Sequence, residues 1–323
     1  MDFLEKIRSA VSDYQMLQRG DAVVAALSGG ADSVSLLYAL KELSGELGIT
    51  VSACHINHHL RGEESDSDMR FCEELCSRLG VPISVREAEV GSMQQKHESL
   101  EECARRVRYD FFAEVSGGKK LATAHNSNDC AETVLLNLMR GTGLKGLCGV
   151  PPVRGNIVRP LIYCTRDDVE EYCKSKGLTW VTDKTNLCDD YTRNKVRHII
   201  LPEMLKINGS LFSTMNRMEK SLREDSDFLE EMARQALESA KKPGGFDSAA
   251  LADLPKPVQS RAIKHIFFAG GIEPSALRIN TAAEILAAGR GKFNPCRGKF
   301  FVVKRGLAYV EEAEQHYRKH ERS

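Results

Sequence analysis

The chain has 323 residues, a length typical of about two domains. Its hydrophobic share of 42%, with 25 glycines and 10 prolines, excludes a disordered or collagenous protein. No run approaches about 18 uninterrupted apolar residues, and the first residues mix charges, so we expect neither a membrane span nor a secretory signal. The 10 cysteines lie mostly inside apolar runs, which favours a reducing, cytoplasmic location. Basic and acidic residues balance at 45 each, so a nucleic-acid partner would need a local basic surface.

Short apolar runs alternate with helical patterns in the first half of the chain. The predicted segments are strand 23–27, helix 33–47, strand 51–55, helix 65–79, strand 82–85, helix 99–115, strand 121–124 and helix 128–140. Such alternation is typical of a parallel sheet with helices on both faces. We therefore predict a doubly wound α/β fold.

The pattern changes after Pro151-Pro152. The predicted segments are then an extended piece at 156–161, a helix at 167–176, a long helix at 213–239, a linker at 242–245, helices at 258–268 and 276–288, and a hairpin with strands at 299–304 and 307–311. We predict an α/β domain over 1–212, a connecting helix and linker over 213–245, and a small, mainly helical domain over 246–323.

A glycine-rich loop, Ser28-Gly29-Gly30-Ala31-Asp32-Ser33, joins the first strand to the first helix of this pattern. Two glycines let the backbone approach an anion, and the unpaired N–H groups of a helix start favour negative charge. Ser28 and Ser33 add hydroxyl donors. The alternative is an ordinary turn in which Asp32 merely occupies a favourable first-turn position. Because all six positions occur together after an apolar strand, we favour a phosphate-binding loop.

The loop lacks the Gly-x-x-x-x-Gly-Lys pattern that places a lysine on a γ-phosphate, and also the Gly-x-Gly-x-x-Gly pattern for a dinucleotide. It resembles the SGGxDS loop of the ATP-pyrophosphatase (PP-loop) superfamily. The resemblance implies that residues 28–33 bind the pyrophosphate of ATP, accompanied by Mg²⁺, that Asp32 also takes part in catalysis, and that AMP is transferred to an oxygen of the substrate.

The second strand runs into His55-Ile56-Asn57-His58-His59-Leu60-Arg61-Gly62. These side chains follow the carboxyl end of a strand, where open α/β sheets bind ligands. A zinc site is an alternative, but histidines on an extended segment point to alternate sides, and no cysteine or carboxylate completes a set, so we predict no metal site. The run resembles the HxNHxLRG signature of the tRNA(Ile)-lysidine synthetase family, and we assign His58 to ATP binding.

Further stretches agree with that family. They are Ala104-Arg105-Arg106-Val107-Arg108-Tyr109, Thr123 to Thr133 (TAHxxxDxxET), Arg140-Gly141-Thr142-Gly143 with Gly146-Leu147, Arg159-Pro160-Leu161, Asp183-Lys184-Thr185-Asn186, and Arg193-Asn194-Lys195-Val196-Arg197. Thr185 stands where serine is usual, and Asn128-Asp129 where a pair of acids is common. Asn128 weakens any scheme that needs two adjacent carboxylates.

The resemblance implies a two-step reaction. ATP adenylates the C2 oxygen of the wobble cytidine in an isoleucine tRNA with a CAU anticodon, and the ε-amine of free L-lysine then displaces AMP. The amine must lose its proton before it attacks, so the site has to hold a cation and then accept a proton.

His125, Asp129 and Glu132 lie at i, i+4 and i+7, nearly on one face of a helix. We expect all three to bind the substrate lysine, and Asp129 and Glu132 to be catalytic. The alternatives are structural: Asn126 would cap the helix, Asp129 would be a first-turn acid, and His125 would make a strand-end hydrogen bond.

Two pairs of arginines at helical spacing carry positive charge. Arg105 and Arg108 are expected to bind phosphate and to steady the charge that develops on adenylation, or else to form ion pairs with Glu101 or Glu102. We assign Arg105 to ATP binding and Arg108 to catalysis. Arg193 and Arg197 are expected to face tRNA, with the same structural alternative, and Asp183 is either a loop-structuring or a catalytic carboxylate.

Cysteine usage separates this chain from related thiolases. Those enzymes use Cys-x-x-Cys pairs or a nucleophilic cysteine, whereas Cys72 and Cys76 are four apart within an apolar helical pattern. A tRNA thiolase is therefore the alternative enzyme, and a catalytically idle ATP-binding or tRNA-binding relative is the alternative from another class.

Six basic residues and no acid lie between Arg290 and Gly306, interleaved with three phenylalanines. Such a segment favours RNA binding, and we assign Arg297 and Lys299 to tRNA. A basic edge strand protected from aggregation is the alternative. Phe300 and Phe301 point to opposite faces of a strand, so at least one belongs to the core. Longer family members carry another C-terminal domain, and the resemblance also allows a homodimer.

Overall fold

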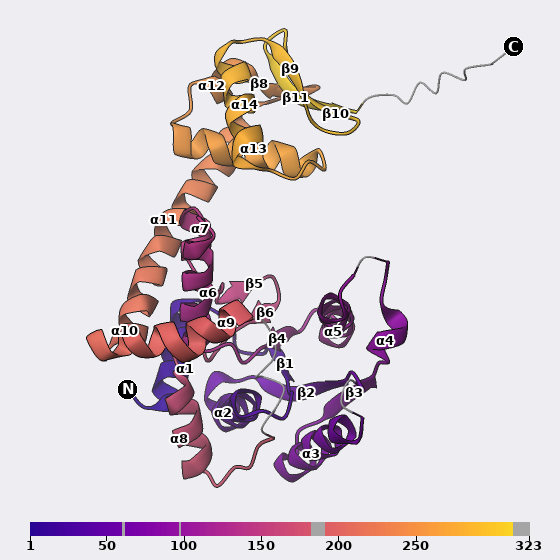
Figure 1. Ribbon diagram of the computed structural model, residues 1–323, viewed down its shortest axis with the longest axis vertical. Helices are drawn as coiled ribbons and strands as arrows, with labels where there is room; N and C mark the ends of the chain where they lie inside the picture. The colour runs from indigo at the N-terminus through magenta and orange to yellow at the C-terminus, as the bar shows by residue number, and fades with distance from the viewer. Residues whose placement is uncertain (60–61, 97, 182–190, 313–323) are drawn as a thin grey trace, which may run out of the picture. The chain divides into compact units, whose positions relative to one another are not determined.

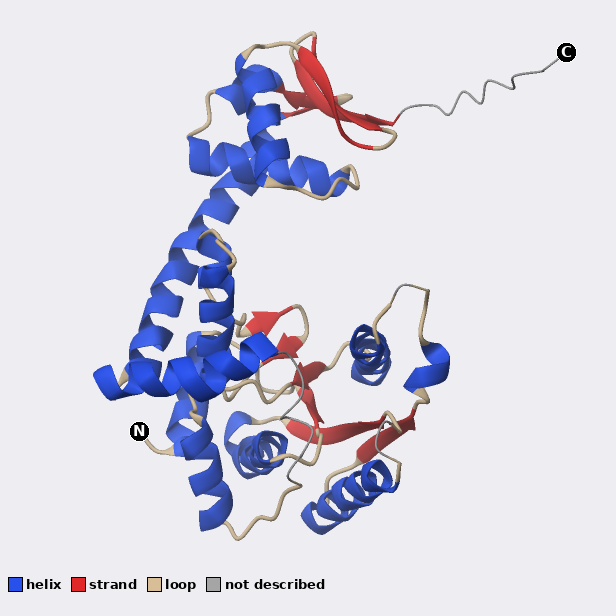
Figure 2. Cartoon of the chain, viewed as in Figure 1, coloured by secondary structure: helices blue, strands red, loops and turns tan. Residues whose placement is uncertain are grey.

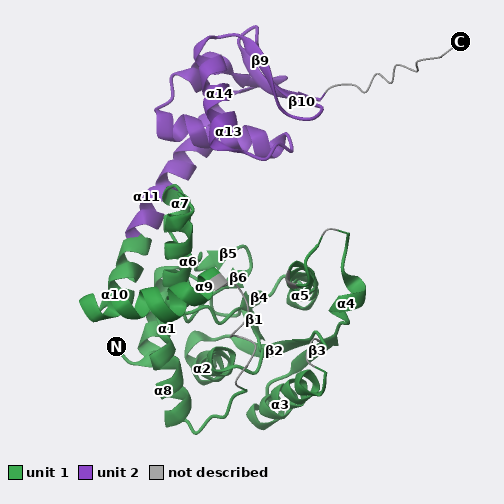
Figure 3. Cartoon of the chain, viewed as in Figure 1, with its two compact units in different colours: residues 1–220 green, residues 221–323 purple. Residues whose placement is uncertain are grey.

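The computed structural model describes residues 1–59, 62–96, 98–181 and 191–312, and it divides into two compact units, Met1–Lys220 and Ser221–Ser323 (Figure 3). The α-helices of the first unit are α1 (Phe3–Asp13), α2 (Ala31–Leu47), α3 (Glu63–Leu79), α4 (Val90–Met93), α5 (Leu100–Ser116), α6 (Ser127–Met139), α7 (Leu144–Leu147), α8 (Arg166–Ser175), α9 (Tyr191–Lys195) and α10 (Leu201–Ile207). A π-helical turn, η2 (Val196–Ile200), joins α9 to α10. The strands are β1 (Ala22–Ala26), β2 (Thr50–Asn57), β3 (Ile83–Glu87), β4 (Lys120–Ala122), β5 (Val153–Arg154) and β6 (Ile157–Val158).

The first unit is built on a six-stranded sheet of order β3-β2-β1-β4-β6-β5 (Figure 1). All neighbours are parallel except β5 and β6, which form a short antiparallel hairpin. Helices α2 and α3 cover one face, and α5 covers the other. Alternate residues of β1 show this division, because Val23 packs in the larger core with α2, whereas Val24 packs with Phe111 of α5. The predicted doubly wound α/β fold is confirmed.

The sequence patterns located β1 to β4 and the helices α2, α3, α5, α6 and α8 to within a few residues. They missed α1 and the short helices α4, α7, α9, η2 and α10. In α1 the apolar positions Phe3, Ile7, Ala10 and Val11 are buried, and Asp2 and Glu5 form a capping box at its start. The same spacing and cap are legible in the sequence, so this helix was open to prediction.

The second unit combines helices with an antiparallel sheet (Figure 2). Its elements are α12 (Ser248–Ala252), α13 (Lys256–Ala269), α14 (Ala276–Ala287), β7 (Lys241–Lys242), β8 (Gly245–Asp247), β9 (Gly291–Cys296), β10 (Lys299–Lys304) and β11 (Leu307–Glu312), and α11 (Leu211–Ala240) contributes to both units. The sheet order is β7-β8-β11-β10-β9. Residues 242–245, expected to be a linker, are instead part of a tight hairpin that opens this sheet, with Gly244 at φ +87°.

The β10–β11 hairpin and its turn were predicted correctly. Arg305 and Gly306 have φ of +54° and +78°, the left-handed pair that a two-residue hairpin turn requires. Phe301 is fully buried against Phe267 and Phe293, whereas Phe300 lies on the opposite face, so the expected division of the two phenylalanines is confirmed.

Candidate functional site

The strand order of the first unit defines where a ligand would bind. From β1 the chain proceeds to β2 and β3 on one side, while β4 lies on the other side, so the order reverses between β1 and β4. Open α/β sheets bind ligands at such a switch point, beyond the carboxyl ends of the strands. Residues 27–30 leave β1 there, and residues 123–126 leave β4 there, which brings two segments almost 100 residues apart to one edge.

The loop after β1 is shaped by its own side chains and glycines. Gly29 has φ +90°, a backbone conformation that residues with a side chain rarely adopt, so this position favours glycine. The Ser33 hydroxyl donates to Gly30 O at 2.9 Å and accepts from Ser28 N at 3.1 Å. Within the described residues, the backbone N–H groups of 29–32 donate to no protein acceptor. The loop therefore presents a row of amides at the start of α2, as an anion site requires.

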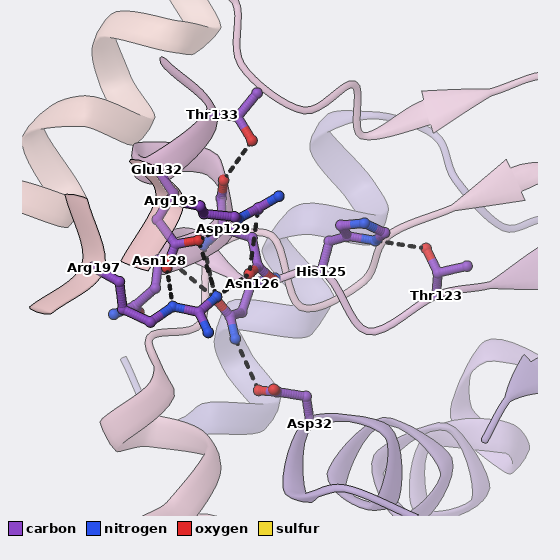
Figure 4. Close-up of polar contacts among 10 residues, drawn as sticks. All are labelled: Asp32, Thr123, His125, Asn126, Asn128, Asp129, Glu132, Thr133, Arg193 and Arg197. Carbon is purple, nitrogen blue, oxygen red and sulfur yellow. Dashed lines mark hydrogen bonds and ion pairs between the residues drawn. The ribbon is translucent and has the colours of Figure 1, made fainter. Parts of the chain in front are cut away.

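Asn126 connects the acidic side chains of the two segments (Figure 4). Its Oδ1 accepts from the backbone N–H groups of Asn128 and Asp129, and its own backbone N–H donates to Asp129 Oδ2 at 3.1 Å. Its Nδ2 donates to Asp32 Oδ1 at 2.8 Å. Burial raises the pKa of Asp32 and the charge of Asp129 raises it further, while the Asn126 hydrogen bond opposes the shift. Asp32 and Asp129 are thus parts of one polar network.

Glu132 lies one turn further along α6 and is fully buried. Arg193 Nε donates to its Oε2 at 2.8 Å, and Arg197 donates from Nε to Oε1 at 2.6 Å and from Nη2 to Oε2 at 3.0 Å. Burial alone would raise the pKa of Glu132, but these hydrogen bonds outweigh it and lower the pKa. Asp129 Oδ1 lies 4.0 Å from Arg193 Nη2 and 3.8 Å from Arg197 Nη2. The two arginines expected to face tRNA therefore also hold the acidic face of α6.

His125 precedes the cap of α6, and its Nδ1 lies 3.1 Å from Thr123 Oγ1 (Figure 4). Burial lowers the pKa of His125, although the charge of Asp129 acts in the opposite direction. At neutral pH the ring is therefore uncharged and able to accept or donate one hydrogen bond at each nitrogen.

Three histidines lie at the carboxyl end of β2 and directly after it, and His55 contacts the residue that precedes the phosphate loop. His55 Nδ1 lies 2.9 Å from Leu27 O, and both ring nitrogens of His58 are buried with no hydrogen-bond partner among the described residues. Burial, aided by the charge of Arg108, lowers the pKa of His58 to about 4, so the ring is neutral at pH 7. His59 lies 2.9 Å from Glu87 Oε2. Leu60, Arg61 and the predicted loop residue Asp183 fall outside the described residues.

Arg105 and Arg108 are exposed on α5. Arg105 stacks on Tyr109, with its guanidinium carbon 5.0 Å from the ring centre. Glu102 accepts hydrogen bonds from Ser99 at the start of the helix.

In the basic segment of the second unit, Lys299 is bonded to other protein groups, whereas Arg297 is exposed to solvent. Lys299 Nζ donates to Gly270 O at 2.7 Å and lies 3.3 Å from Glu312 Oε1. The first of these contacts joins β10 to the C-terminal end of α13. Arg297 is exposed in the turn before β10. The outer face of the sheet forms a shallow hollow of about 650 Å³, lined among others by three further cations, one acid and an aromatic ring: Arg290, Lys292, Lys304, Glu311 and Tyr309. Lys292 Nζ donates to Glu311 Oε2 at 2.9 Å, so part of the positive charge is balanced on the surface.

The nine described cysteines are free, and eight of them are buried. Burial raises the pKa of Cys76 and of Cys173 to about 11 and that of Cys54 to about 12, so these thiols are protonated at neutral pH. Across the part of the chain that is described, no group of three or more His, Cys, Asp or Glu is arranged to hold a metal ion.

Residues 2–204 match the model of the PP-loop domain family. The chain belongs to this family. Two curated relatives of the PP-loop protein are the tRNA(Ile)-lysidine synthases of Caldanaerobacter subterraneus subsp. tengcongensis, 37% identical over 88% of this chain and 62% of the relative, and of Clostridioides difficile, 39% identical over 81% and 60%. The chain thus spans less than two thirds of these relatives' length.

A solved structure with a similar fold is the U34-tRNA thiolase NcsA from Methanococcus maripaludis, with a TM-score of 0.57 and 19% identity over 68% of this chain and 79% of that chain. At this level of sequence identity, the similarity shows that the two proteins share a fold and shows nothing about a shared activity. None of the helices in the described residues has the length and apolar character that crossing a membrane requires.

The sequence indicated the carboxylates of the site but not the hydrogen bonds by which Asn126 links Asp32 to Asp129. Asn126 was expected only as the cap of α6, and its contact with Asp32 spans 94 residues. Likewise, Arg193 and Arg197 were paired with each other by spacing, but nothing local indicated Glu132, 61 and 65 residues earlier, as their partner.

Proposed function

We propose that this PP-loop protein is a tRNA(Ile)-lysidine synthetase, which ligates free L-lysine to C2 of the wobble cytidine of the CAU-anticodon isoleucine tRNA and releases AMP and pyrophosphate. The observation that carries the proposal is the meeting, at the switch point of the sheet, of the amide row of residues 29–32 with the acidic face of α6. The similarity to curated lysidine synthases over 81–88% of the chain supports the same activity.

In the adenylation step, residues 28–33 would bind the phosphates of ATP. Gly29 allows close approach, and the N–H groups of the α2 start favour negative charge. Exposed Arg105 and Arg108 on α5 would bind the nucleotide and the charge that develops as AMP is transferred. The neutral ring of His58 would act as a hydrogen-bonding group for the nucleotide rather than as a cation.

The polar network at Asn126 fits a divalent cation that accompanies ATP. Mg²⁺ is typically held by one or two carboxylates together with substrate phosphates, and Asp32 and Asp129 supply two carboxylates tied to the same asparagine. Bound there, the ion would neutralise charge on the phosphates.

In the lysine step, His125, Asp129 and Glu132 would form the binding site, with unequal tasks. Both Glu132 oxygens accept short hydrogen bonds from arginines, whereas Asp129 Oδ1 lies no closer than 3.8 Å to a guanidinium. Asp129 is therefore the better acceptor for the lysine ammonium and its proton. Glu132 would keep Arg193 and Arg197 beside the site, where their remaining charge would meet tRNA phosphate.

The outer face of the sheet in the second unit supports a tRNA-binding role. Lys292 and Lys304 lie in the hollow with Tyr309, and basic groups beside an aromatic ring suit single-stranded RNA. Exposed Arg297 would add a phosphate contact. Lys299, whose ammonium is bonded to Gly270, would act chiefly by holding β10 in place.

The cell location and the assembly are further parts of the proposal. The buried, protonated cysteines suit the cytoplasm, where tRNA is modified. Exposed apolar side chains on the first unit, such as Leu138, Met139 and Ile207, suit a homodimer. Sedimentation of the purified chain would test it, and a monomer at micromolar concentration would remove the dimer from the proposal.

The direct test incubates the protein with ATP, radiolabelled lysine and purified isoleucine tRNA. We expect label in the tRNA that requires ATP and is matched by AMP. Release of ADP, or label without ATP, would exclude the mechanism. Methionine tRNA with the same anticodon is the substrate control.

The residue that carries the lysine step is tested by Asp129→Asn. This change keeps the shape of the side chain and its cap bond, so tRNA should still bind, but it removes the negative charge. We expect lysine incorporation to fall about 1,000-fold, equal to ~4 kcal/mol of activation free energy. Asp167→Asn, an exposed first-turn acid of α8, is the matched control. Near-normal incorporation by Asp129→Asn would remove Asp129 from the site.

A further inference from the structure

We propose that Asn126 is a positioning residue that holds the carboxylates of Asp32 and Asp129 in one fixed relation, so that a single divalent cation bound with ATP contacts both. This inference rests on the proposed function and extends it to a residue outside the predicted catalytic and binding set. It follows from the hydrogen bonds of one buried side chain.

Capping α6 does not by itself require asparagine. A cap needs a side-chain oxygen, and serine, threonine or aspartate would supply it as well. Among these cap residues only asparagine also carries a side-chain N–H, and here that group donates to Asp32 Oδ1 at 2.8 Å. The hydrogen bond to Asp32, rather than the cap, is therefore what requires asparagine at this position.

The orientation of the amide is fixed by its surroundings. Asn126 is fully buried, and its Oδ1 faces the N–H groups of Asn128 and Asp129. A flipped amide would place Nδ2 against two donors and Oδ1 against the Asp32 carboxylate, and both contacts would be repulsive. Asn126 is thus a rigid link between α2 and α6 (Figure 4).

The charges around Asp32 show why such a link is needed. Asp32 is influenced by the negative charge of Asp129 on α6 and by the positive charges of Arg166 on α8 and Arg197 on η2, and it influences the Cys173 thiol on α8. Without a donor between them, Asp32 and Asp129 would repel each other and Asp32 would be free to turn towards an arginine. The Asn126 amide keeps Asp32 directed to α6, where a cation would be shared.

The test measures Mn²⁺ binding by electron paramagnetic resonance in the presence of a non-hydrolysable ATP analogue. In Asn126→Ser the hydroxyl oxygen retains the cap, but the amide N–H that reaches Asp32 is lost, and the shorter hydroxyl remains at the start of α6. We therefore expect Mn²⁺ affinity to fall about tenfold while the analogue binds equally well without metal. The adenylation rate with Mg²⁺ should fall with the metal affinity. Asn128→Ser is the matched control, because its side chain accepts from Arg166 N and contacts neither carboxylate.

Three outcomes would overturn the inference: wild-type Mn²⁺ affinity in Asn126→Ser, an equal loss in Asn128→Ser, or losses that simply add when Asn126→Ser is combined with Asp32→Asn. If the serine variant does not fold, a crystal structure of the wild-type protein with the analogue and Mn²⁺ decides instead. An ion touching both carboxylates with the Asn126–Asp32 bond intact supports the inference, and an Asn126 amide turned to the nucleotide refutes it. A wild-type protein that binds both ligands but transfers no lysine would refute the proposed function alone.

Discussion

The acidic face of α6 in the first unit and the outer face of the sheet in the second unit both concentrate charge, but in opposite ways. On α6 the carboxylates are buried or nearly so, and each has a defined partner in Asn126, Arg193 or Arg197. On the sheet, Lys292 and Lys304 are exposed around an open hollow, and the one acid there, Glu311, pairs with Lys292 at the surface, where water also reaches both groups. Buried charges need fixed partners because their desolvation is costly, whereas exposed charges are screened by salt.

The difference in burial between the two charged regions indicates a different function for each. A fixed arrangement of buried charge favours chemistry on one small group, because orientation is set before the ligand arrives. An exposed cationic face favours binding to a long polyanion, since each contact is weak and many add up. Substitutions in the two regions should therefore differ in their effects on stability and on RNA binding.

The largest effect is expected from breaking the buried cluster at Arg197. Arg197→Gln removes two hydrogen bonds to Glu132, whose carboxylate has no exposed surface, and should lower the free energy of unfolding by ~3 kcal/mol. Urea unfolding followed by circular dichroism measures it. Arg193→Gln, at a more exposed arginine with one such bond, should cost less. Equal and small losses in both variants would show that the cluster behaves like surface charge.

An intermediate effect is expected on the sheet of the second unit. Replacing Lys292 and Lys304 together by glutamine should leave stability almost unchanged, weaken tRNA binding about tenfold at ~0.1 M salt, and reduce the salt dependence of the affinity by about two counterions. Filter binding over a salt series measures both quantities. Lys256→Gln, at an exposed cation of α13, is the control. An unchanged salt slope in the double variant would exclude this face from RNA binding.

The smallest effect concerns an ordinary partly buried pair. Asp168 accepts hydrogen bonds from Lys6 Nζ at 2.6 Å and from Thr165 at the start of α8. Burial alone would raise the pKa of Asp168, but these partners outweigh it and lower the pKa. Asp168→Asn should therefore cost ~1 kcal/mol near neutral pH.

The pH dependence of that pair gives the sign of the effect. Because the folded state holds the pKa of Asp168 below 3.8, its stabilisation is complete above that value and is lost as the pH falls through the lowered pKa. The stabilities of Asp168→Asn and the wild type should converge as the pH falls below the lowered pKa of Asp168. A difference that persists in acid would mean that shape rather than charge stabilises this contact, and Asp167→Asn is the control.

The sequence by itself determined the features that depend on neighbours along the chain. Strand–helix alternation indicated the α/β fold, and the run from Ser28 to Ser33 indicated the anion loop, because a helix start with glycines has the same amides in any fold. Alternation along 299–304 placed Phe300 and Phe301 on opposite faces of one strand. The 3.6-residue period placed Asp129 and Glu132 on one helical face.

Only the tertiary structure decided what those side chains contact. Strand order brought Asp32 to Asn126, and α9 and η2 brought Arg193 and Arg197 to Glu132. The cap residue of α6 therefore also links two carboxylates, and two arginines predicted to contact tRNA also pair with a buried acid. In the same way, pairing with β11 turned a glycine-containing linker at 242–245 into part of a sheet. These contacts join residues far apart in sequence. Burial of apolar surface supplies the free energy that brings them together, and each charge buried with it needs a partner, which no local pattern of residues encodes.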